Sequence, residues 1–203
     1  MGSKERILRH KEEKRCNILE AALDIAKSEG WNSLSMRKIA DAIEYTAPII
    51  YEYFSNKEAI LKELTRIGYK KLITKLEEAK AEHDTPEKQL EAMWLAYWNF
   101  ALAETELYQL MFGVEMNCCE CETLDIPESD IASEMYRDLI VEILDRNKQN
   151  YVSDDICKKY YTFWSVVHGL ISINIVRRGA PDDLNEQILR DAITGIIGTM
   201  TTK

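Results

Sequence analysis

The amino-acid sequence predicts an all-α protein, and three observations support that fold class. Pro and Gly, the residues that most often interrupt helices, number only 4 and 8 in 203 residues. Apolar residues recur at intervals of three and four along most of the chain, which is helical spacing. No segment alternates apolar and polar residues convincingly with period two, so we expect no β-sheet. The apolar fraction of 46% is enough for a sizeable core.

The first predicted helix covers residues 15–28. Ile18, Ala22 and Ile25 fall on one face of this segment at helical spacing. Gly30 follows as a C-terminal stop signal. The segment is therefore an amphipathic helix with one face available for a core.

Two shorter helices follow the first. Ser35 is a good N-cap for a helix over residues 36–43. Thr46 is an N-cap candidate for a helix over residues 47–53, in which Pro48 occupies the first turn, where a missing N–H is tolerated.

The rest of the chain predicts longer helices. We expect the boundary between two parts of the protein within the first of these helices, residues 57–82. Residues 113–126 interrupt the helical pattern. The predicted ranges are 57–82, 86–103, 104–112 as a helix or bent extension, 127–148, 153–178 and 182–200.

Charge is distributed unevenly between the two parts. The formal net charge is −9, but residues 1–71 carry 14 Lys and Arg against 11 Asp and Glu, whereas residues 72–203 carry 12 against 24. This asymmetry indicates different partners for the two parts. The first part can approach phosphates, and the second keeps the protein in solution.

Several classes of protein do not fit the sequence. No apolar run approaches the roughly 18 residues that a membrane span needs, and the charged N-terminus lacks the apolar core of a secretory signal. We therefore expect a cytoplasmic protein whose 5 cysteines are reduced. There is no nucleophile–base pair, phosphate loop or pair of His ligands at helical spacing, so we predict neither an enzyme nor a bound cofactor or metal.

The segment 35–53 has the pattern of a helix-turn-helix, because two short helices are joined by a tight turn. In that motif both helices bury one face on a preceding helix. The second helix then presents its N-terminal residues to the major groove of DNA.

Five stretches of this region stand out: Ile18-Leu19-Glu20-Ala21-Ala22-Leu23, Glu29-Gly30-Trp31, Ser35-Met36-Arg37-Lys38-Ile39-Ala40, Thr46-Ala47-Pro48-Ile49-Ile50-Tyr51-Glu52-Tyr53-Phe54 and Asn56-Lys57-Glu58. Through these stretches the sequence resembles the DNA-binding domain of TetR-family regulators over about residues 13–62. The resemblance implies an all-α homodimer with a three-helix DNA-binding domain at residues 1–60 and a larger effector-binding and dimerisation domain at residues 61–203. It also implies a regulator, more often a repressor than an activator, that leaves its operator when a small molecule binds.

The turn of the motif departs from the family pattern. The family usually has Gly where this chain has Glu44, and a small aliphatic residue where it has Tyr45. Glu44 must then adopt the turn geometry without the conformational freedom of glycine, at modest cost.

The resemblance assigns DNA contacts to eight residues. Those expected mainly on phosphates are Ser35, Arg37, Tyr51 and Lys57, and those at the start of the reading helix are Thr46, Ala47, Pro48 and Ile49. Apolar side chains at base edges meet thymine methyl groups, and this helix has no Arg, Asn or Gln for bidentate readout. DNA shape should therefore contribute a large share of specificity. We expect Ile50, Tyr53 and Phe54 in the core.

The basic segment 4–15 allows two interpretations. It either adds phosphate contacts or forms a disordered tail, and we favour the tail.

The motif Trp-x-x-x-His-Gly at residues 164–169 is similar to the C-terminal part of a TetR subgroup with a Trp-His-Gly signature. Either His168 lines an effector pocket, or it is a packed core histidine beside a helix-packing glycine, which we favour. The candidate effector-binding residues are Trp94, Tyr97, Trp98, Phe112, Trp164 and His168. Aromatic residues are usually plain core, but a pocket lined by them would take a hydrophobic or amphipathic small molecule.

The cluster Cys118, Cys119 and Cys121 supports an alternative, a thiol- or metal-sensing regulator. Its spacing differs from the usual Cys-x-x-Cys of structural zinc, and neighbouring Glu residues raise thiol pKa values. We favour a loop with free thiols.

The last two helices carry more apolar surface than one subunit can cover, which indicates an interface. The resemblance makes them a four-helix dimer bundle, and two-fold symmetry then predicts a palindromic operator on double-stranded DNA. The residues on these faces are Phe163, Val167, Leu170, Ile171, Asn174 and Ile175 on the first helix, and Leu184, Ile188, Ala192, Ile193, Ile196, Ile197 and Met200 on the second.

Overall fold

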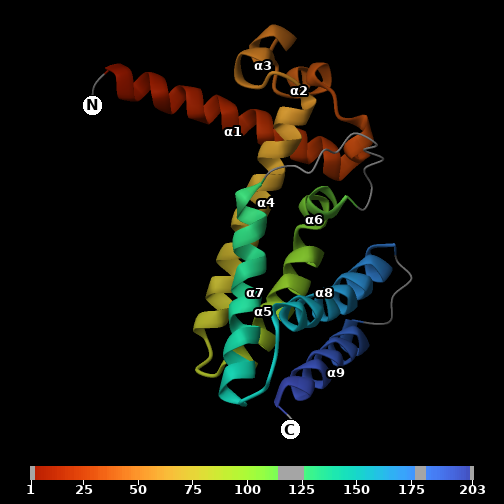
Figure 1. Ribbon diagram of the computed structural model, residues 1–203. Coiled ribbons are helices and arrows are strands. Elements are labelled where there is room, and N and C mark those ends of the chain that lie inside the picture. The colour runs from red at the N-terminus through yellow and green to blue at the C-terminus, as the bar shows by residue number, and fades with distance from the viewer. Residues whose placement is uncertain (1–2, 114–125, 177–181, 202–203) are drawn as a thin grey trace. The chain divides into compact units, whose positions relative to one another are not determined.

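The computed structural model describes residues 3–113, 126–176 and 182–201, and helices are the only regular secondary structure in these residues (Figure 1). The all-α prediction is confirmed. No helix in these ranges is long and apolar enough to cross a membrane. The elements are α1 (Ser3–Glu29), the 3-10 helix η1 (Trp31–Ser33), α2 (Met36–Ala42), α3 (Ala47–Tyr53), α4 (Lys57–Ala81), α5 (Pro86–Ala103), α6 (Thr105–Phe112), α7 (Pro127–Arg146), α8 (Ser153–Ile175) and α9 (Asp182–Thr201).

The prediction of a disordered N-terminal tail is wrong, because α1 begins at Ser3. The residues before Arg15 are mostly Lys, Arg and Glu, which have high helix propensity. Local ion pairs add to this: Arg9 Nε lies 3.6 Å from Glu13 Oε1, and His10 Nδ1 lies 3.1 Å from Glu13 Oε2. These local terms favour a helix before Arg15.

The chain forms two compact units, and the division between them falls inside α4. The N-terminal unit contains residues 1–68 together with α6 from Glu106 onward. The C-terminal unit contains Tyr69–Thr105 and the chain from Ile126 onward. The N-terminal unit thus includes a helix beyond the predicted domain of residues 1–60.

The core of the N-terminal unit is built from one face of each of its helices. Ile18 of α1, Ile39 of α2 and Ile50 of α3 are completely buried, and α6 adds Leu107 and Leu110. Fully burying such a side chain contributes about 1.5–3 kcal/mol. The helix-turn-helix pair, α2 and α3, and the preceding helix α1 therefore share one core with α6.

Two contacts explain why α6 packs here. Trp31 is buried, and its indole Nε1 donates a hydrogen bond to the Glu106 carbonyl at 3.1 Å. At Gly68 of α4, an added Cβ would lie 2.6 Å from Met111 Sδ. The absence of a side chain at Gly68 thus allows α6 to approach α4 closely.

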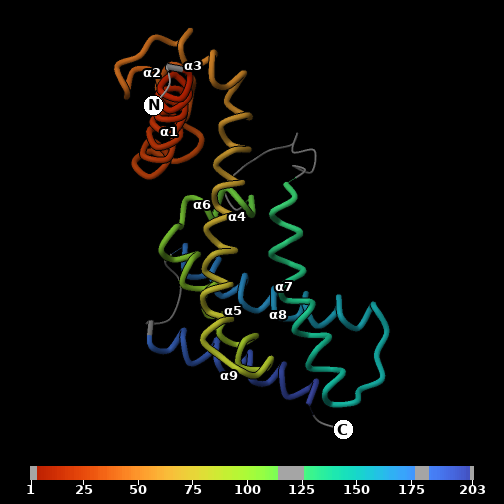
Figure 2. Tube along the Cα trace, turned by 90° about the vertical axis from the view of Figure 1, so that its left-hand side faces the viewer, coloured from red at the N-terminus to blue at the C-terminus, as the bar shows by residue number. Residues whose placement is uncertain are grey.

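In the C-terminal unit α5 packs against α7, α8 and α9 (Figure 2). Leu90, Met93 and Trp94 on α5 are completely buried. Tyr136 of α7 is also buried, and its hydroxyl donates to the Met93 carbonyl at 3.1 Å. The aromatic residues of α5 are therefore the centre of this unit's core.

The last two helices lie side by side in both views (Figure 1 and Figure 2). Asn185 of α9 is completely buried and donates through Nδ2 to Asn174 Oδ1 of α8 at 2.8 Å. Lys159 Nζ also donates to Thr199 Oγ1 at 2.6 Å. These bonds fix the register of α9 on α8.

Candidate DNA-binding site

The first helix of the predicted motif, α2, is capped as expected. Ser35 Oγ accepts a hydrogen bond from the backbone N–H of Lys38 at 3.2 Å. The Lys38 ammonium in turn pairs with the Glu29 carboxylate at the end of α1. Ser35 remains exposed to solvent at the start of the helix.

The turn between α2 and α3 contains a left-handed residue at Glu44, the position where the family usually has Gly. Glu44 has a φ of 56°, in the left-handed region that favours glycine. The N–H of the next residue, Tyr45, donates to the Ala40 carbonyl at 2.9 Å and closes the turn. Glu44 thus adopts a glycine-like conformation, which costs about 1–2 kcal/mol for a residue with a Cβ.

The second helix, α3, turns its N-terminal side chains outward. Thr46 occupies the N-cap position, where its carbonyl accepts from the Ile49 N–H at 2.9 Å and its side chain makes no capping bond. Thr46, Pro48 and Tyr51 are exposed, whereas Ala47 and Ile49 are partly buried. The hydroxyl of Thr46 is therefore not occupied by its own helix.

The opposite side of α3 belongs to the core, as predicted. Ile50 and Phe54 are buried, and Tyr53 packs against the core while partly exposed. The guanidinium of Arg15 lies over the Phe54 ring, 4.6 Å from its centroid. These contacts hold one side of α3 against the core, whereas Thr46 and Pro48 at its start remain exposed.

The two predicted basic contacts differ in their surroundings. The Arg37 side chain is 89% exposed, and its ion pair with Asp41 spans 4.0 Å. Lys57 is partly buried, and its ammonium donates to the Trp31 carbonyl at 3.2 Å. Lys57 thus joins the start of α4 to η1, a structural role that the sequence did not indicate.

The six candidate effector residues are divided between the two compact units. Trp94, Tyr97 and Trp98 are buried on α5 in the C-terminal unit. Phe112 belongs to the N-terminal unit, where its ring packs on Tyr108 with centroids 4.9 Å apart.

The buried aromatic cluster contains Tyr136 and Tyr160, which the sequence did not single out, and Phe163, which the sequence placed on the dimer face. The Trp94 ring stacks on Tyr136 with centroids 4.0 Å apart and on Phe163 with centroids 5.6 Å apart. Tyr160 lies 6.2 Å from Trp94. These aromatic residues come from three different helices, α5, α7 and α8. No local pattern in the sequence could therefore predict that their rings meet.

Trp164 and His168 are stacked on one face of α8, as their spacing predicts, with ring centroids 4.4 Å apart. Both are partly buried, and burial lowers the pKa of His168 from its ordinary 6.5, which favours the neutral ring. Among the described residues, nothing lies within 4 Å of a Cβ added at Gly169. The interpretation of Gly169 as a helix-packing residue within the chain is therefore wrong.

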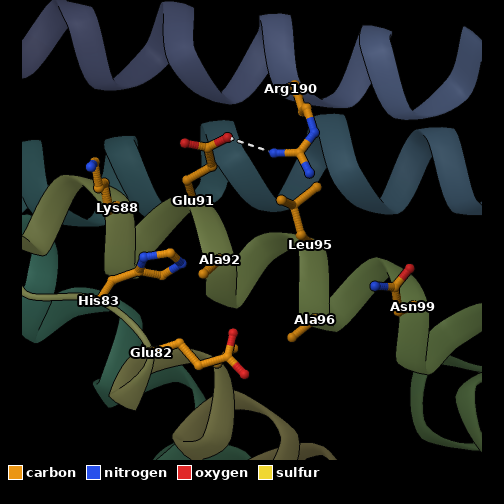
Figure 3. Close-up of a pocket in the computed structure, with 10 residues that line it drawn as sticks. Glu82, His83, Lys88, Glu91, Ala92, Leu95, Ala96, Asn99 and Arg190 are labelled. Carbon is orange, nitrogen blue, oxygen red and sulfur yellow. Dashed lines mark hydrogen bonds and ion pairs between the residues drawn. The ribbon is translucent and has the colours of Figure 1, made fainter.

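Two grooves open on the C-terminal unit. The first, about 520 Å³, lies between the end of α4, α5 and α9, and Figure 3 shows His83, Lys88 and the ion pair of Arg190 with Glu91 around it. The second, about 530 Å³, lies between α4 and α5 and is lined by Phe100 among others. None of the six candidate effector residues lines either groove.

Two family models match this chain. The model described as "Bacterial regulatory proteins, tetR family" matches residues 18–64, which include α2, α3 and the turn. The model described as "Tetracyclin repressor-like, C-terminal domain" matches residues 90–195, about half of the chain.

The chain belongs to the TetR family.

Relatives agree with this assignment. The HTH-type transcriptional regulator YuxN of Bacillus subtilis (strain 168) is 29% identical over 114 residues, which are 53% of this chain and 39% of YuxN. The HTH-type transcriptional activator FasR of Mycolicibacterium smegmatis is 22% identical over 137 residues, 68% of this chain and 61% of FasR. The matched region thus spans less than two thirds of either relative.

The fold also agrees with solved structures. A protein from Rhodococcus sp. RHA1 superposes with a TM-score of 0.79 at 20% identity, covering 93% of this chain and 95% of that one. This superposition supports the all-α fold of the TetR-family chain, and residues 18–64, which hold α2 and α3, match the family's regulatory-protein model.

The alternative sensing site lies outside the described residues, because Cys118, Cys119 and Cys121 fall between residues 114 and 125. Within the described part of this TetR-family chain, Cys16 and Cys157 are exposed free thiols. No group of three potential metal ligands occurs there.

Proposed function

We propose that this TetR-family protein is a repressor that binds a palindromic operator as a homodimer and is released by a small-molecule effector. The main observation that supports the proposal is that the side chains of Thr46, Pro48 and Tyr51, at the start of α3, are exposed to solvent. The same helix is anchored from behind by the fully buried Ile50. An exposed helix start on a rigid base is what insertion into a major groove requires.

The individual contacts follow from exposure and chemistry. Ser35, Arg37 and Tyr51 contact phosphates. Lys57 also contacts a phosphate, because only one of the three N–H groups of its ammonium is used by the Trp31 carbonyl. The hydroxyl or backbone N–H of Thr46 meets a phosphate, and Ala47, Pro48 and Ile49 face the bases. Methyl and methylene groups at these positions select thymine methyls and DNA shape.

The dimer forms through the outward faces of α8 and α9. Val166 and Ile173 on α8 and Leu184 and Ile188 on α9 are between 37% and 49% exposed. Other residues predicted for this interface, such as Phe163, are buried within the chain. A second copy that covers the exposed side chains would remove apolar surface from water, and two-fold symmetry would require a palindromic operator.

The effector binds in the larger domain, predicted at residues 61–203 and taken here as the C-terminal unit, Tyr69–Thr105 and the chain from Ile126. The DNA-binding domain, predicted at residues 1–60, is taken as the N-terminal unit, which includes α6. The effector site is the aromatic region of α5 and α8 that includes Trp94 and Trp164, which suits a hydrophobic or amphipathic molecule. Because α4 contributes residues to both units, a shift of α4 on effector binding would reach the reading helix.

The test is direct measurement of operator binding. An operator is first selected from randomised duplex DNA with the wild-type protein, and affinity is then measured by fluorescence anisotropy. We expect the double variant Thr46→Ala, Tyr51→Ala to bind at least about tenfold more weakly, equivalent to about 1.4 kcal/mol. Tyr151→Ala, which changes a tyrosine outside the N-terminal unit, should bind as the wild type does.

Unchanged affinity of the double variant would overturn the assignment of α3. A transcription assay on a promoter that contains the selected operator tests the sign of regulation. Repression supports the proposal, whereas activation, the activity in the name of the relative FasR, would contradict the repressor assignment.

A further inference from the structure

The first half of α1 is a helix that the rest of the chain does not support. Every residue from Lys4 to Lys14 is exposed, and the core begins only at Ile18. In Figure 1 this part of α1 runs clear of α2 and α3, which belong to the same unit. Isolated helices of this length are marginal in water. A segment that buries nothing in its own chain has a surface available for another molecule.

Charges on this segment are separated by helical face. Successive residues of an α-helix are 100° apart around its axis. On this basis, an arc of about 120° around residues 4–15 contains no acidic residue, and the three acidic residues, Glu5, Glu12 and Glu13, lie on the opposite side. The acid-free arc, called here the cationic face, consists of Lys4, Ile7, Leu8, Lys11, Lys14 and Arg15.

The direction of the cationic face is fixed by two contacts with the helix-turn-helix. Lys14 Nζ lies 5.7 Å from the ring centroid of Tyr45 in the turn before α3. The Arg15 guanidinium lies over Phe54, the C-cap of α3. The cationic face therefore lies on the side of α1 that borders the turn and α3, and it extends from Lys14 and Arg15 toward the N-terminal end of α1.

We propose that the cationic face of α1 is a second DNA-binding surface, which contacts phosphates beside the site read by α3. This inference rests on the proposed operator binding. Two features favour DNA as the partner: the exposed charges of Lys4, Lys11 and Lys14 have no acidic neighbour on the same face, and the face is continuous with the helix-turn-helix. The remaining cation of the face, Arg15, is paired with Glu63 and anchors the face to the unit. Phosphate contacts add affinity and salt dependence but no sequence information.

The experiment compares two double variants that remove the same charge from opposite faces. Lys4→Gln, Lys11→Gln changes the cationic face, and Arg6→Gln, Arg9→Gln changes the other. Gln has a helix propensity close to that of Lys and Arg, and all four residues are exposed, so both variants should fold. Affinity for the selected operator duplex is measured by anisotropy over a range of salt concentrations.

We expect the slope of log affinity against log salt to become shallower in Lys4→Gln, Lys11→Gln, by about 0.9 for each phosphate that the variant no longer neutralises. The Arg6→Gln, Arg9→Gln variant should keep a slope close to that of the wild type. Equal slopes for both variants, with specific binding by the wild type, would overturn this inference and leave the proposed function standing. A wild-type protein that selects no operator would overturn both.

The exposed Ile7 (63%) and Leu8 (66%) also make this face suitable for an anionic membrane surface. Sedimentation with phosphatidylserine-containing vesicles separates the two partners. Vesicle binding that Lys4→Gln, Lys11→Gln abolishes, together with an unchanged DNA salt slope, would overturn the DNA assignment.

Discussion

Arg15 of α1 and Glu63 of α4 form an ion pair, with Arg15 Nη2 3.1 Å from Glu63 Oε2. The other carboxylate oxygen of Glu63 accepts from Arg66 at 2.9 Å. Burial raises the pKa of Glu63, but the hydrogen bonds from Arg66 and Arg15 outweigh it, so that the pKa lies below its ordinary 4.5. The pair joins the helix that carries the cationic face to the helix that leaves the DNA-binding domain.

Replacing Glu63 by Gln should destabilise the protein by about 1 kcal/mol at neutral pH, because two charge-assisted hydrogen bonds are weakened. A carboxylate with a lowered pKa in the folded state contributes stability above its unfolded pKa and loses it as pH falls through the folded value. The difference between wild type and variant in chemical denaturation should therefore shrink from pH 7 toward pH 3. Glu77→Gln, at an exposed position of α4, is the control and should change stability little. An equal effect at both positions would show that the ion pair adds nothing.

Glycine at position 44 should stabilise the N-terminal unit. Glu44 has a φ of 56°, which glycine adopts without steric strain. Relief of this strain is partly offset by the larger entropy of glycine in the unfolded chain, so we expect a net gain of about 0.5–1 kcal/mol in urea denaturation. A loss of stability in Glu44→Gly would contradict the strain argument.

Valine at the same position provides the opposite test. A β-branched side chain is especially unfavourable at positive φ. We expect Glu44→Val to lower stability by more than about 1 kcal/mol and to weaken operator binding, since the turn orients α3. Ile43 precedes the turn with a φ of −110°, so Ile43→Val should be much milder.

A charge on the outward face of α8 should dissociate the dimer. Val166 is 37% exposed and lies one helical turn before Gly169, where an added Cβ would have nothing within 4 Å in the described residues. We expect Val166→Asp to shift the protein to a monomer at micromolar concentration in analytical ultracentrifugation, because a carboxylate would be buried unpaired in the interface. Ile131→Asp introduces the same charge at an exposed position of α7, 47% exposed, and should leave the dimer intact. A dimeric Val166→Asp protein would rule out this face.

The stack of Trp164 on His168 should report on protonation of the imidazole. Burial lowers the pKa of His168, so the ring is neutral at pH 7 and becomes charged only as pH falls below 6.5. A protonated imidazole 4.4 Å from an indole quenches its fluorescence. We expect tryptophan emission to decrease below pH 6.5, and this step to disappear in His168→Gln.

The matched control is His83→Gln, which removes a histidine from the groove at the end of α4 and should keep the step. If tryptophan emission still decreased below pH 6.5 in His168→Gln, the decrease would be caused by a group other than His168.

Local sequence signals were sufficient for the helices and for the helix-turn-helix. The cap at Ser35, Pro48 at the start of α3 and the helical spacing of Ile18 and Ala22 act within one or two turns. Glu44 is the most informative case, because its departure from the family's glycine predicted a left-handed residue, which the structure has. The start of α1 was misjudged because a charged sequence suits both an exposed helix and a disordered tail.

The sequence by itself determined the fold class and the family, because caps, periodicity and motif residues are encoded over short distances. Only the tertiary structure decided which helix completes the DNA-binding unit, through Trp31 and Glu106, 75 positions apart. It also decided which aromatic residues meet Trp94, and that the ammonium of Lys57 binds a carbonyl of η1. These contacts join residues whose separation in sequence carries no periodic signal, so they follow from packing of the whole unit and not from any single segment.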